Sequence, residues 1–431
     1  MSAIADILAD AGVSVSGCDL KRSAATDLLR RRGIDVTIGH DASHLDGVDL
    51  VVVTSAVKGH NIEIDAAHEK GVRVMKRSSV LGEIVNAKRG IGISGTHGKT
   101  TTSAMVSVVL EEAGLDPTIL VGGVLRNLDS NAKSGKGDFV VVEADEYDRT
   151  FHQLHPEIAV ITNIEADHLE YYGSFENIVE AFRIFTEGVK PQGVVIACVD
   201  DPNVQDLLRL VHHRVVRYGL GDFAELRAVN VRFADRGSAF EVPGVGFFKL
   251  FIPGEHNVRN ALAAIGVGLE LGIPAEKIAA ALSKFLGVDR RFQILGEYAG
   301  ALIVDDYAHH PTEIAATLSA ARSGYPNRRL VALFQPHLYS RTRDFAREFG
   351  EALSAADIAI VTPIYAAREQ PISGVSARLI AEATKGVEFL DRSNSEVVNE
   401  LRRRILPGDV FIAMGAGDVH EIAESLVRGG A

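Results

Sequence analysis

A glycine-rich loop near residue 95 constrains what this chain can fold into more than any other stretch. Ile91 and Ile93 precede the loop and predict a buried strand, and the run after Lys99 predicts a helix that ends near Gly114. Glycines at a strand-to-helix junction let backbone N–H groups approach phosphate oxygens, and the positive end of the helix dipole lies beside them. The segment therefore predicts a phosphate-binding site within an α/β domain.

The loop, GTHGKTT, departs from the strict P-loop pattern, because Ile93 stands where that pattern places its first glycine. In P-loop chemistry the lysine, here Lys99, binds the β- and γ-phosphates, and the following hydroxyl, here Thr100, holds Mg²⁺. The alternative is a glycine turn with a solvated lysine. Gly-Lys-Thr-Thr directly after a predicted strand favours the phosphate site.

Length and composition indicate several α/β domains. A chain of 431 residues, 46% of them hydrophobic and 24% charged, can bury more than one core. We expect three domains, over 1–87, 88–294 and 295–431. The predicted fold class is α/β, with a truncated Rossmann-like N-terminal domain, a central P-loop ATPase-like domain and a C-terminal Rossmann-like domain.

Charge and cysteine content argue against several classes of protein. The net charge of −12 disfavours nucleic-acid binding, which requires a basic surface. The chain has no run of about 18 apolar residues and no basic signal region at its start, so we expect no membrane insertion and a cytoplasmic location. Cys18 and Cys198 are too few and too far apart to predict a disulfide framework or a zinc site.

Residues 1–87 have the pattern of a nucleotide-binding α/β unit. Asp19 closes an early strand, where an acidic side chain can hydrogen-bond a ribose or a base. A doubly wound domain normally opens with a strand and a glycine-rich turn, but here the first predicted element is a helix over 2–11. We therefore expect that the natural start lies upstream. Further elements are predicted as strands over 13–20, 35–39 and 50–53 and a helix over 23–33.

Two strands of the central domain end in polar residues. Glu143 ends the apolar run FVVV, and Asn163, Asp167 and His168 follow the run IAVI. A carboxylate at the end of a buried strand beside a phosphate loop is placed to bind a nucleotide-bound metal ion. The alternatives are a solvated acidic loop and a structural histidine, but two strands ending in this way favour the functional interpretation.

Two further segments have polar residues that suit a nucleotide. His256, Asn257 and Asn260 open a small-residue helix and could face a base or ribose; an ordinary packing helix is the alternative, and spacing does not decide between them. Arg290 and Arg291 lie in a predicted turn and could clamp a phosphate.

The last domain alternates strand and helix, which predicts a parallel sheet with ligands at the carboxyl ends of its strands. The short glycine pattern at 415–417 is too weak to be given a role. The strand-end loops carry Asp305, Asp306, Tyr307, His309, His310, His337, Tyr339, Arg341 and Arg343.

Seven segments, spread over nearly the whole chain, resemble one known family. That family is the Mur ligases, the ATP-dependent amide-forming enzymes of peptidoglycan precursor synthesis. The last two segments resemble its alanine-adding branch. In chain order the segments are GTHGKTT, EADEYD, NIEADHLEYYG, HNVRNALAA, DRRF, DDYAHHPTE and FQPHLYSRT.

The resemblance implies an enzyme that joins L-alanine to the carboxylate of UDP-N-acetylmuramate, with ATP as co-substrate and two Mg²⁺ ions. ATP would phosphorylate the carboxylate to an acyl phosphate, which the alanine amino group would then attack. Because charge builds on phosphoryl oxygens in the first step, positioning and cations should dominate catalysis.

The resemblance also implies site residues, position by position. The catalytic set is Lys99, Glu143 and His168, and the metal ligands are Thr100, Glu143 and His168. ATP is bound by Gly95, Thr96, Gly98, Lys99, Thr100, Thr101, His256, Asn257, Asn260, Arg290, Arg291 and Asp306. The substrates are bound by Asp19, His97, Tyr307, His309, His337 and Arg341.

Several alternatives stay open at this point. A recycling ligase would attach a whole tripeptide to the same UDP-sugar, and a nucleotide-binding protein without ligase activity would result if the incomplete first domain bound no sugar. Sister ligases carry a carbamylated lysine after the metal histidine, but 175–187 has no lysine, so we expect none. The oligomeric state is also open, with a homodimer as one alternative.

Overall fold

The chain folds into two compact units that each combine segments distant in the sequence. The computed structural model describes residues 1–54, 57, 59–234, 237–367 and 369–429. The first unit comprises Met1–Val124, Leu128–Arg227 and Asn260–Ala281, and the second comprises Leu125–Asn127, Ala228–Arg259 and Leu282–Ala431. Among the described residues, no helix has the length and apolar character needed to cross a bilayer.

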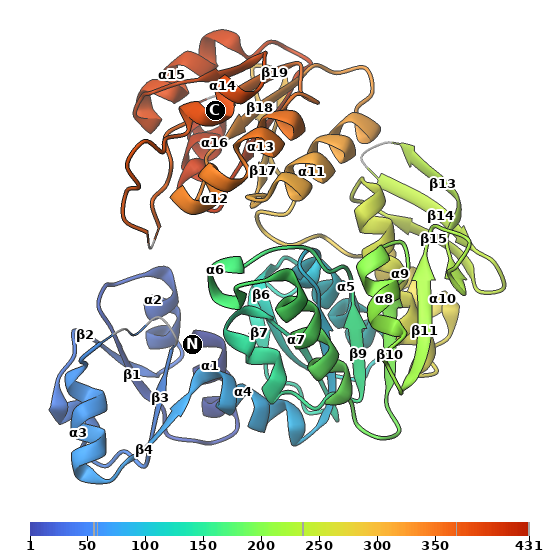
Figure 1. The fold of residues 1–431 in the computed structure, drawn as a ribbon. Coiled ribbons are helices and arrows are strands. Elements are labelled where there is room, and N and C mark those ends of the chain that lie inside the picture. Colours follow the sequence, from blue (N-terminus) through green and yellow to red (C-terminus); the bar gives the residue numbers. More distant parts are fainter. Residues whose placement is uncertain (55–56, 58, 235–236, 368, 430–431) are drawn as a thin grey trace. The chain divides into compact units, whose positions relative to one another are not determined.

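The N-terminal part of the first unit alternates helices with short parallel strands, as predicted. Its strands form two separate pairs, with Cys18 opposite Thr37 in one and Val52 opposite Met75 in the other. The elements, coloured blue in Figure 1, are α1 (Ser2–Asp10), β1 (Ser16–Asp19), α2 (Ala24–Arg31), β2 (Asp35–Ile38), η1 (Ala42–Leu45), β3 (Leu50–Val53), α3 (Ile62–Lys70), β4 (Arg73–Lys76) and α4 (Arg77–Asn86).

An eight-stranded sheet with the order β12-β11-β10-β9-β5-β8-β6-β7 forms the centre of the first unit. Its elements are β5 (Arg89–Ser94), α5 (Lys99–Glu112), β6 (Thr118–Leu125), β7 (Ser130–Lys133), β8 (Phe139–Glu143), η2 (Tyr147–Gln153), β9 (Ile158–Ile161), α6 (Leu169–Tyr172), α7 (Phe175–Glu187), β10 (Val194–Cys198), α8 (Pro202–Leu208), β11 (Arg214–Gly219), β12 (Leu226–Arg227), α9 (Glu255–Glu270) and α10 (Ala275–Ser283).

The register of the central strands brings the predicted polar strand ends to one edge. Strand β5 pairs in parallel with β8 on one side and β9 on the other, with Ile93 opposite Glu143 and Ser94 opposite Ile161. The loops that follow these three strands therefore leave the sheet at the same level. This is the placement that the sequence predicted from the carboxyl ends of parallel strands.

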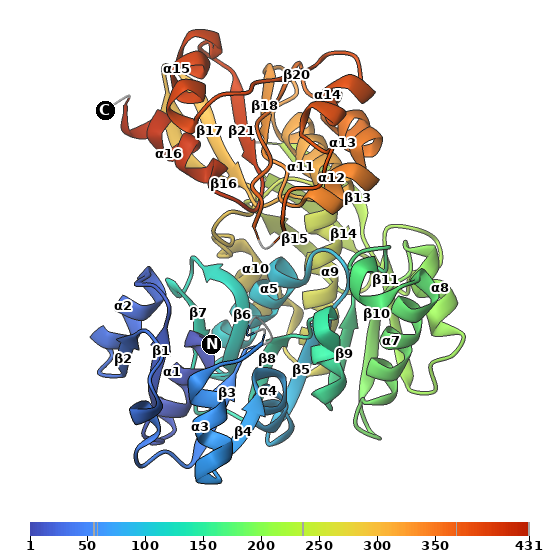
Figure 2. The same ribbon diagram turned by 60° about the vertical axis from the view of Figure 1, so that its left-hand side comes forward.

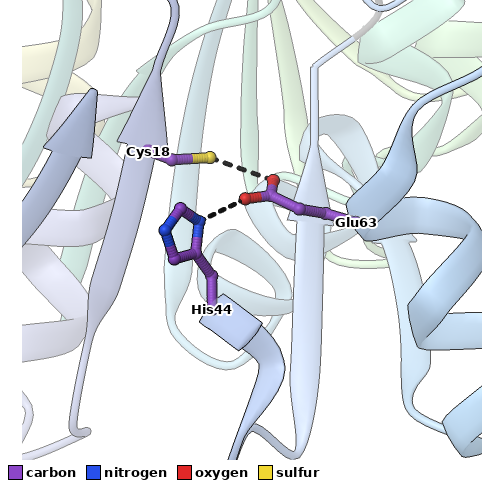
Figure 3. A group of neighbouring side chains, drawn as sticks. All are labelled: Cys18, His44 and Glu63. Carbon is purple, nitrogen blue, oxygen red and sulfur yellow. Dashed lines mark hydrogen bonds and ion pairs between the residues drawn. The ribbon is translucent and has the colours of Figure 1, made fainter. Parts of the chain in front are cut away.

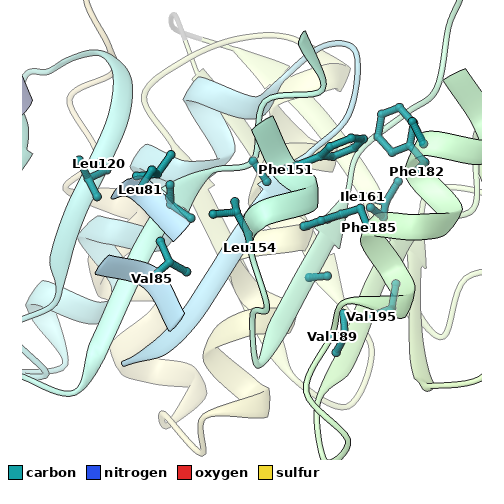
Figure 4. Packing of buried hydrophobic residues seen from close by; sticks show 14 of the residues in the cluster. Leu81, Val85, Leu120, Phe151, Leu154, Ile161, Phe182, Phe185, Val189 and Val195 are labelled. Carbon is teal, nitrogen blue, oxygen red and sulfur yellow. The ribbon is translucent and has the colours of Figure 1, made fainter. Parts of the chain in front are cut away.

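One face of this sheet is covered by α4 and α7, which share a core (Figure 4). Phe151 stacks on Phe185 with ring centroids 5.1 Å apart and meets the edge of Phe182 at 5.4 Å. Ile4 and Ile7 of α1 belong to the same buried cluster. Residues 1–10 therefore pack as part of the first unit, and burial of their apolar surface stabilises it.

The second unit contains a small antiparallel sheet and a six-stranded sheet with the order β16-β17-β21-β18-β19-β20, in which only the β16–β17 pair is antiparallel. Its elements are β13 (Val229–Ala234), β14 (Gly237–Val242), β15 (Gly246–Leu250), β16 (Gln293–Tyr298), β17 (Ala301–Asp306), α11 (Pro311–Gly324), β18 (Leu330–Phe334), α12 (Tyr339–Asp344), α13 (Ala346–Leu353), β19 (Ile358–Val361), α14 (Arg378–Ala383), β20 (Val387–Phe389), α15 (Asn394–Arg404), β21 (Val410–Met414) and α16 (Val419–Arg428).

Helices cover both faces of the six-stranded sheet, as Figure 2 shows for α11, α13 and α14 on one side and α15 and α16 on the other. Leu302 and Val304 point into the first layer, whereas Ala301 and Ile303 point into the second. Because successive strand residues face opposite sides, a strand buried on both faces must be apolar throughout. The predicted parallel α/β sheet over the last part of the chain is confirmed.

Candidate functional site

The loop at Gly95–Thr101 has the backbone of a phosphate site. Gly95 has φ +136°, and a Cβ there would lie 2.0 Å from the Thr162 hydroxyl oxygen. Gly98 has φ +83° and is the N-cap of α5. The glycine cap has no side chain that could cap the first N–H groups of the helix, and N–H groups in this position commonly bind anions. Both glycines are therefore required by the local geometry.

The segment that follows β9 holds this loop in place. Asn163 accepts a hydrogen bond from the backbone N–H of His97 at 2.8 Å and donates one to the His97 carbonyl at 3.0 Å. The Thr96 N–H donates to the Asn163 carbonyl at 3.0 Å, and the Thr96 hydroxyl accepts from the Glu165 N–H at 2.8 Å. Asn163 therefore shapes the loop rather than only lining its mouth.

We expect Asn163→Ala to weaken ATP binding by about 30-fold, because two hydrogen bonds of the loop backbone are lost at a cost of about 1 kcal/mol each. The measurement is the KM for ATP beside a direct binding titration. Asn399→Ala, at an exposed position of α15, is the matched control. An unchanged ATP affinity in Asn163→Ala would show that the loop holds its shape without this side chain.

Lys99 is held at the loop by a buried carboxylate that the sequence analysis did not single out. Its ammonium donates to Glu146 at 2.9 Å and to the Gly95 and Thr96 carbonyls at 2.6 and 3.1 Å. Burial alone would lower the pKa of Lys99, but the neighbouring carboxylates, Glu146 first, outweigh it and raise that pKa. The cation is thus fully charged and lies within a few ångströms of the phosphate loop.

Two of the predicted metal ligands lie together. The Thr100 hydroxyl hydrogen-bonds the carboxylate of Glu143, which also accepts from the Gly122 N–H at 2.7 Å. Burial raises the pKa of Glu143, and these hydrogen bonds oppose the rise. A Cβ at Gly122 would lie 2.7 Å from the carboxylate, so a larger residue there would displace the Glu143 side chain from this position. A hydroxyl beside a carboxylate is an oxygen donor pair of the kind that Mg²⁺ prefers.

His168, the third predicted metal ligand, begins α6 in the left-handed region with φ +56°. Its ring lies 5.0 Å from the ring of Tyr147, and its Nε2 is 3.9 Å from the Asp167 carboxylate. Tyr147 follows Glu143 by four residues, so the aromatic contact fixes His168 beside the segment that carries Glu143. His97, predicted to bind substrate, points its Nε2 at Glu165 over 3.3 Å.

Helix α9 carries the next predicted nucleotide residues. Asn260 accepts a hydrogen bond from the Thr102 hydroxyl at 3.1 Å, and its Oδ1 lies where a Cβ at Gly98 would clash. Within the second unit, the Asn257 side chain donates to the Pro253 carbonyl at 2.7 Å. Burial lowers the pKa of His256 to about 4, so this imidazole is neutral near pH 7. Asn260 thus lies directly against the phosphate loop.

In the second unit, Arg290 is tied to the glycine turn at 415–417 that the sequence left without a role. Its guanidinium donates to the Gly415 and Gly417 carbonyls at 2.7 and 3.1 Å and lies 4.9 Å from the Tyr307 ring centroid. Arg291 lies over the same ring at 5.2 Å. Tyr307 is therefore packed between two cations, of which Arg291 is the less constrained.

Both carboxylate oxygens of Asp306 accept hydrogen bonds from backbone N–H groups. Oδ2 accepts from the Phe292 N–H and Oδ1 from the Ala308 N–H, each at 2.8 Å. Burial raises the pKa of Asp306 to about 6, against the opposing charge of Arg291. The side chain thus joins the turn before β16 to the loop after β17, and contact with a nucleotide stays a prediction.

Because both oxygens of Asp306 act as acceptors, we expect Asp306→Asn to lower the free energy of unfolding by about 1–3 kcal/mol, since an NH₂ group would face a backbone N–H. Urea unfolding at neutral pH measures this, with the exposed Asp391→Asn as the control. Unchanged stability together with lost activity would instead indicate that Asp306 acts mainly on the nucleotide.

The residues predicted to face the amino acid gather on the second unit's strand-end loops. The rings of Tyr307 and His309 lie 5.2 Å apart, and those of His309 and His337 lie 6.0 Å apart. Burial lowers the pKa of His309 to about 4, and the charge of Arg341 contributes in the same direction. The neutral imidazole of His309 beside the buried Arg341 suits a carboxylate ligand.

Asp19 lies at the end of β1 and is exposed, with one carboxylate oxygen accepting from the Lys21 N–H at 3.1 Å. Its side chain is therefore open for hydrogen bonds to a ligand. The residues that sequence reasoning missed are Gly122, Glu146, Glu165 and Gln335, the last of which donates to Asp418 at 2.7 Å. Of these four residues, only Glu146 could have been identified from the sequence, because it is the fourth residue of the EADEYD motif that begins at Glu143.

The chain has an α/β fold, and its glycine loop, Lys99 and the Thr100–Glu143 pair have the arrangement expected of a nucleotide-dependent enzyme. Comparison with known proteins is more specific: residues 1–89 match the catalytic domain of the Mur ligase family, 93–268 the Mur ligase middle domain and 290–417 the Mur ligase glutamate ligase domain. The chain therefore belongs to the Mur ligase family.

Individual relatives cover nearly the whole chain. A UDP-N-acetylmuramate–L-alanine ligase of Trichlorobacter lovleyi is 45% identical over 99% of this chain and 96% of its own. A crystal structure of a UDP-N-acetylmuramate–alanine ligase from Thermotoga maritima matches with a TM-score of 0.82 at 30% identity, covering 100% of this chain and 96% of that one. A murein peptide ligase of Psychrobacter arcticus matches with a TM-score of 0.71 at 26% identity, covering 99% and 96%.

Proposed function

We propose that this chain joins L-alanine to the carboxylate of UDP-N-acetylmuramate with ATP as co-substrate. The observation that carries the proposal is the phosphate loop beside the Thr100–Glu143 pair, in a chain 45% identical to an alanine ligase. ATP and a UDP-sugar are both cytoplasmic metabolites, so we place the reaction in the cytoplasm. We also propose a homodimer, which the mass of the protein in solution would test.

In the first step a carboxylate oxygen attacks the γ-phosphorus of ATP, the bond to the β-phosphate oxygen breaks, and ADP leaves. The N–H groups at the start of α5 and the ammonium of Lys99 bind the phosphate oxygens. Charge develops on these oxygens in the transition state, so preorganised donors stabilise it more than the ground state.

Thr100, Glu143 and His168 would hold Mg²⁺; the hydroxyl and the carboxylate supply the oxygen ligands that this ion prefers, and His168 would add one nitrogen ligand. Bound there, Mg²⁺ would neutralise charge on the phosphates. The protein's own contribution is to keep the Glu143 carboxylate aligned through the Gly122 N–H and the Thr100 hydroxyl. Two ions, as predicted for the family, would share Glu143.

In the second step the alanine ammonium loses a proton to solvent, the resulting amine attacks the acyl carbon, and phosphate leaves as the nitrogen gives up a second proton to solvent and the amide forms. We propose that Arg341 binds the alanine carboxylate, with Tyr307, His309 and His337 around it. Asp19 would hydrogen-bond the uridine part of the sugar nucleotide.

The experiment is a phosphate-release assay with Mg-ATP, UDP-N-acetylmuramate and a panel of acceptors. We expect release only when both the UDP-sugar and L-alanine are present. Normal ATP binding without phosphate release would instead identify a nucleotide-binding protein that lacks ligase activity.

The similarity to a murein peptide ligase makes tripeptide ligation the second candidate. Replacing alanine by L-alanyl-γ-D-glutamyl-meso-diaminopimelate in the same assay separates the two. We expect kcat/KM to be at least about 100-fold higher for alanine, and the reverse preference would favour the recycling reaction.

A further inference from the structure

A second group of metal-binding side chains lies in the N-terminal part, away from the phosphate loop. Cys18 comes from β1, His40 from the loop after β2, His44 from η1 and Glu63 from the first turn of α3. Figure 3 shows the Cys18 thiol, the His44 ring and the Glu63 carboxylate pointing toward one another. Four segments therefore bring one thiol, two imidazoles and one carboxylate together, and none of these residues is among those proposed above to bind ATP, Mg²⁺ or the substrates.

The distances between these groups are short. Glu63 Oε2 lies 3.0 Å from Cys18 Sγ and 3.1 Å from His40 Nδ1, and Glu63 Oε1 lies 2.6 Å from His44 Nδ1. Cys18 Sγ and His40 Nδ1 are 3.2 Å apart. One ligand atom each from Cys18, His44 and Glu63 all lie within 4.8 Å of one another.

These separations suit a tetrahedral cation after a small adjustment. With bonds of about 2.3 Å to sulfur and about 2.0–2.1 Å to nitrogen, tetrahedral Zn²⁺ holds its ligand atoms about 3.3–3.6 Å apart. The hydrogen-bonded atoms, now 2.6–3.2 Å apart, would move outward by about 0.2–0.7 Å, and ligand atoms that now lie up to 4.8 Å apart would move closer together. Thiolate and imidazole select Zn²⁺ and similar borderline-soft ions over Mg²⁺ and Ca²⁺.

The surroundings of the group also fit a metal centre. The second ring nitrogen of His44 lies 3.3 Å from the Thr37 hydroxyl, and Glu63 Oε1 accepts from the Asp41 N–H at 3.3 Å. Such outer hydrogen bonds orient metal ligands. The Glu63 side chain is 12% exposed while both histidines are near 28–29% exposed, so an ion has a route in from solvent.

We infer that Cys18, His44 and Glu63, with His40 as fourth ligand, form a site for Zn²⁺ or a cation of the same class. On binding, the Cys18 S–H bond breaks, the proton goes to solvent, and the sulfur lone pair forms the bond to the metal. The imidazoles bind in their neutral form through Nδ1. The ion then joins β1, η1 and α3, and its binding requires neither ATP nor UDP-sugar.

Co²⁺ tests this inference, because only a thiolate ligand produces an intense near-ultraviolet charge-transfer band and the phosphate site contains no thiol. We expect the full-length protein to show the band and to saturate at one equivalent. Cys18→Ser should abolish the band, and Cys198→Ala, which removes the other cysteine, buried in β10, should keep it. No band, a band that needs a large excess of Co²⁺, or a band lost only in Cys198→Ala would overturn the assignment.

Competition with Zn²⁺ gives the affinity and a second readout. We expect His44→Asn to weaken Zn²⁺ binding by about 100-fold, comparable to the loss of a well-oriented ligand contact. Stoichiometric Zn²⁺ should raise the Tm of wild-type protein by several degrees and leave that of Cys18→Ser unchanged. An equal Tm rise in both proteins would overturn the inference. Neither readout involves turnover, so failure here would leave the ligase proposal standing.

Discussion

Lys99→Ala should reduce phosphate release by at least about 100-fold, the loss typical when one preorganised donor to a developing negative charge is removed. The ammonium lies at the phosphate loop, where it contacts the Gly95 and Thr96 carbonyls. Its positive charge would be lost, whereas the N–H groups at the start of α5 would remain. ATP affinity should fall less than kcat, because charge grows in the transition state.

The same substitution should also destabilise the fold, and this effect must be separated from catalysis. Lys99 neutralises Glu146, which is 3% exposed and bonded to it at 2.9 Å. Removing one partner of a buried pair costs about 3–5 kcal/mol because the other charge is left unpaired. The double variant Lys99→Ala with Glu146→Gln should recover most of that stability without recovering activity.

Lys277→Ala, at an exposed position of α10, serves as the matched control for both measurements. Phosphate release and the urea unfolding midpoint should both be measured for the wild type, Lys99→Ala, the double variant and Lys277→Ala. If the double variant regained near-normal turnover, Lys99 would serve the fold alone and the P-loop assignment would be wrong.

The placement of the central site residues was predictable because sheet geometry determines it. Once Ile93, Val140–Glu143 and Ile158–Ile161 are recognised as buried parallel strands, their following loops must leave the same edge. The glycine loop is equally readable, since Gly95 and Gly98 adopt positive φ angles that other residues rarely do.

Contacts that depend on distant loops were not predictable from spacing. Gly122 lies on β6, and nothing local indicates that its N–H will meet Glu143. The antiparallel sheet β13–β15 was missed as well. The cluster around Glu63 combines residues 18, 40, 44 and 63, a spacing unlike the short motifs of known zinc sites, so sequence reasoning dismissed Cys18.

Some residues that resemblance predicts as ligands also have structural tasks. Arg290 binds the glycine turn, and Asp306 binds two backbone N–H groups. A family motif identifies which positions match the family. It does not by itself show that the residue at such a position contacts the ligand. Substitutions at these two positions should therefore affect stability and activity together, unlike substitutions at Lys99 once Glu146 is neutralised.

Glu143→Gln should lower kcat by about 100-fold or more while keeping the site's shape, because an amide oxygen can still accept from the Gly122 N–H. The substitution removes only the charge and the metal-binding power of one oxygen. Activity should then require a higher Mg²⁺ concentration, which a titration of phosphate release against Mg²⁺ would measure. Glu382→Gln, at an exposed position of α14, is the matched control.

Although Glu143→Gln should lower activity, it should raise the stability of the protein relative to wild type near neutral pH. Burial raises the pKa of Glu143 above its ordinary value of 4.5, so the native state binds more protons than the unfolded chain just above that pH. The Glu143 carboxyl therefore contributes its full stabilisation at pH values below its pKa in the unfolded chain. This contribution is lost as the pH rises through its pKa in the folded protein. The Glu143→Gln variant does not undergo this loss. Its free energy of unfolding should therefore rise relative to that of the wild type as the pH increases from about 4.5 toward neutrality. Parallel urea titrations at several pH values measure the difference. A pH-independent difference would mean that Glu143 is paired as well in the folded protein as it is hydrated in the unfolded one.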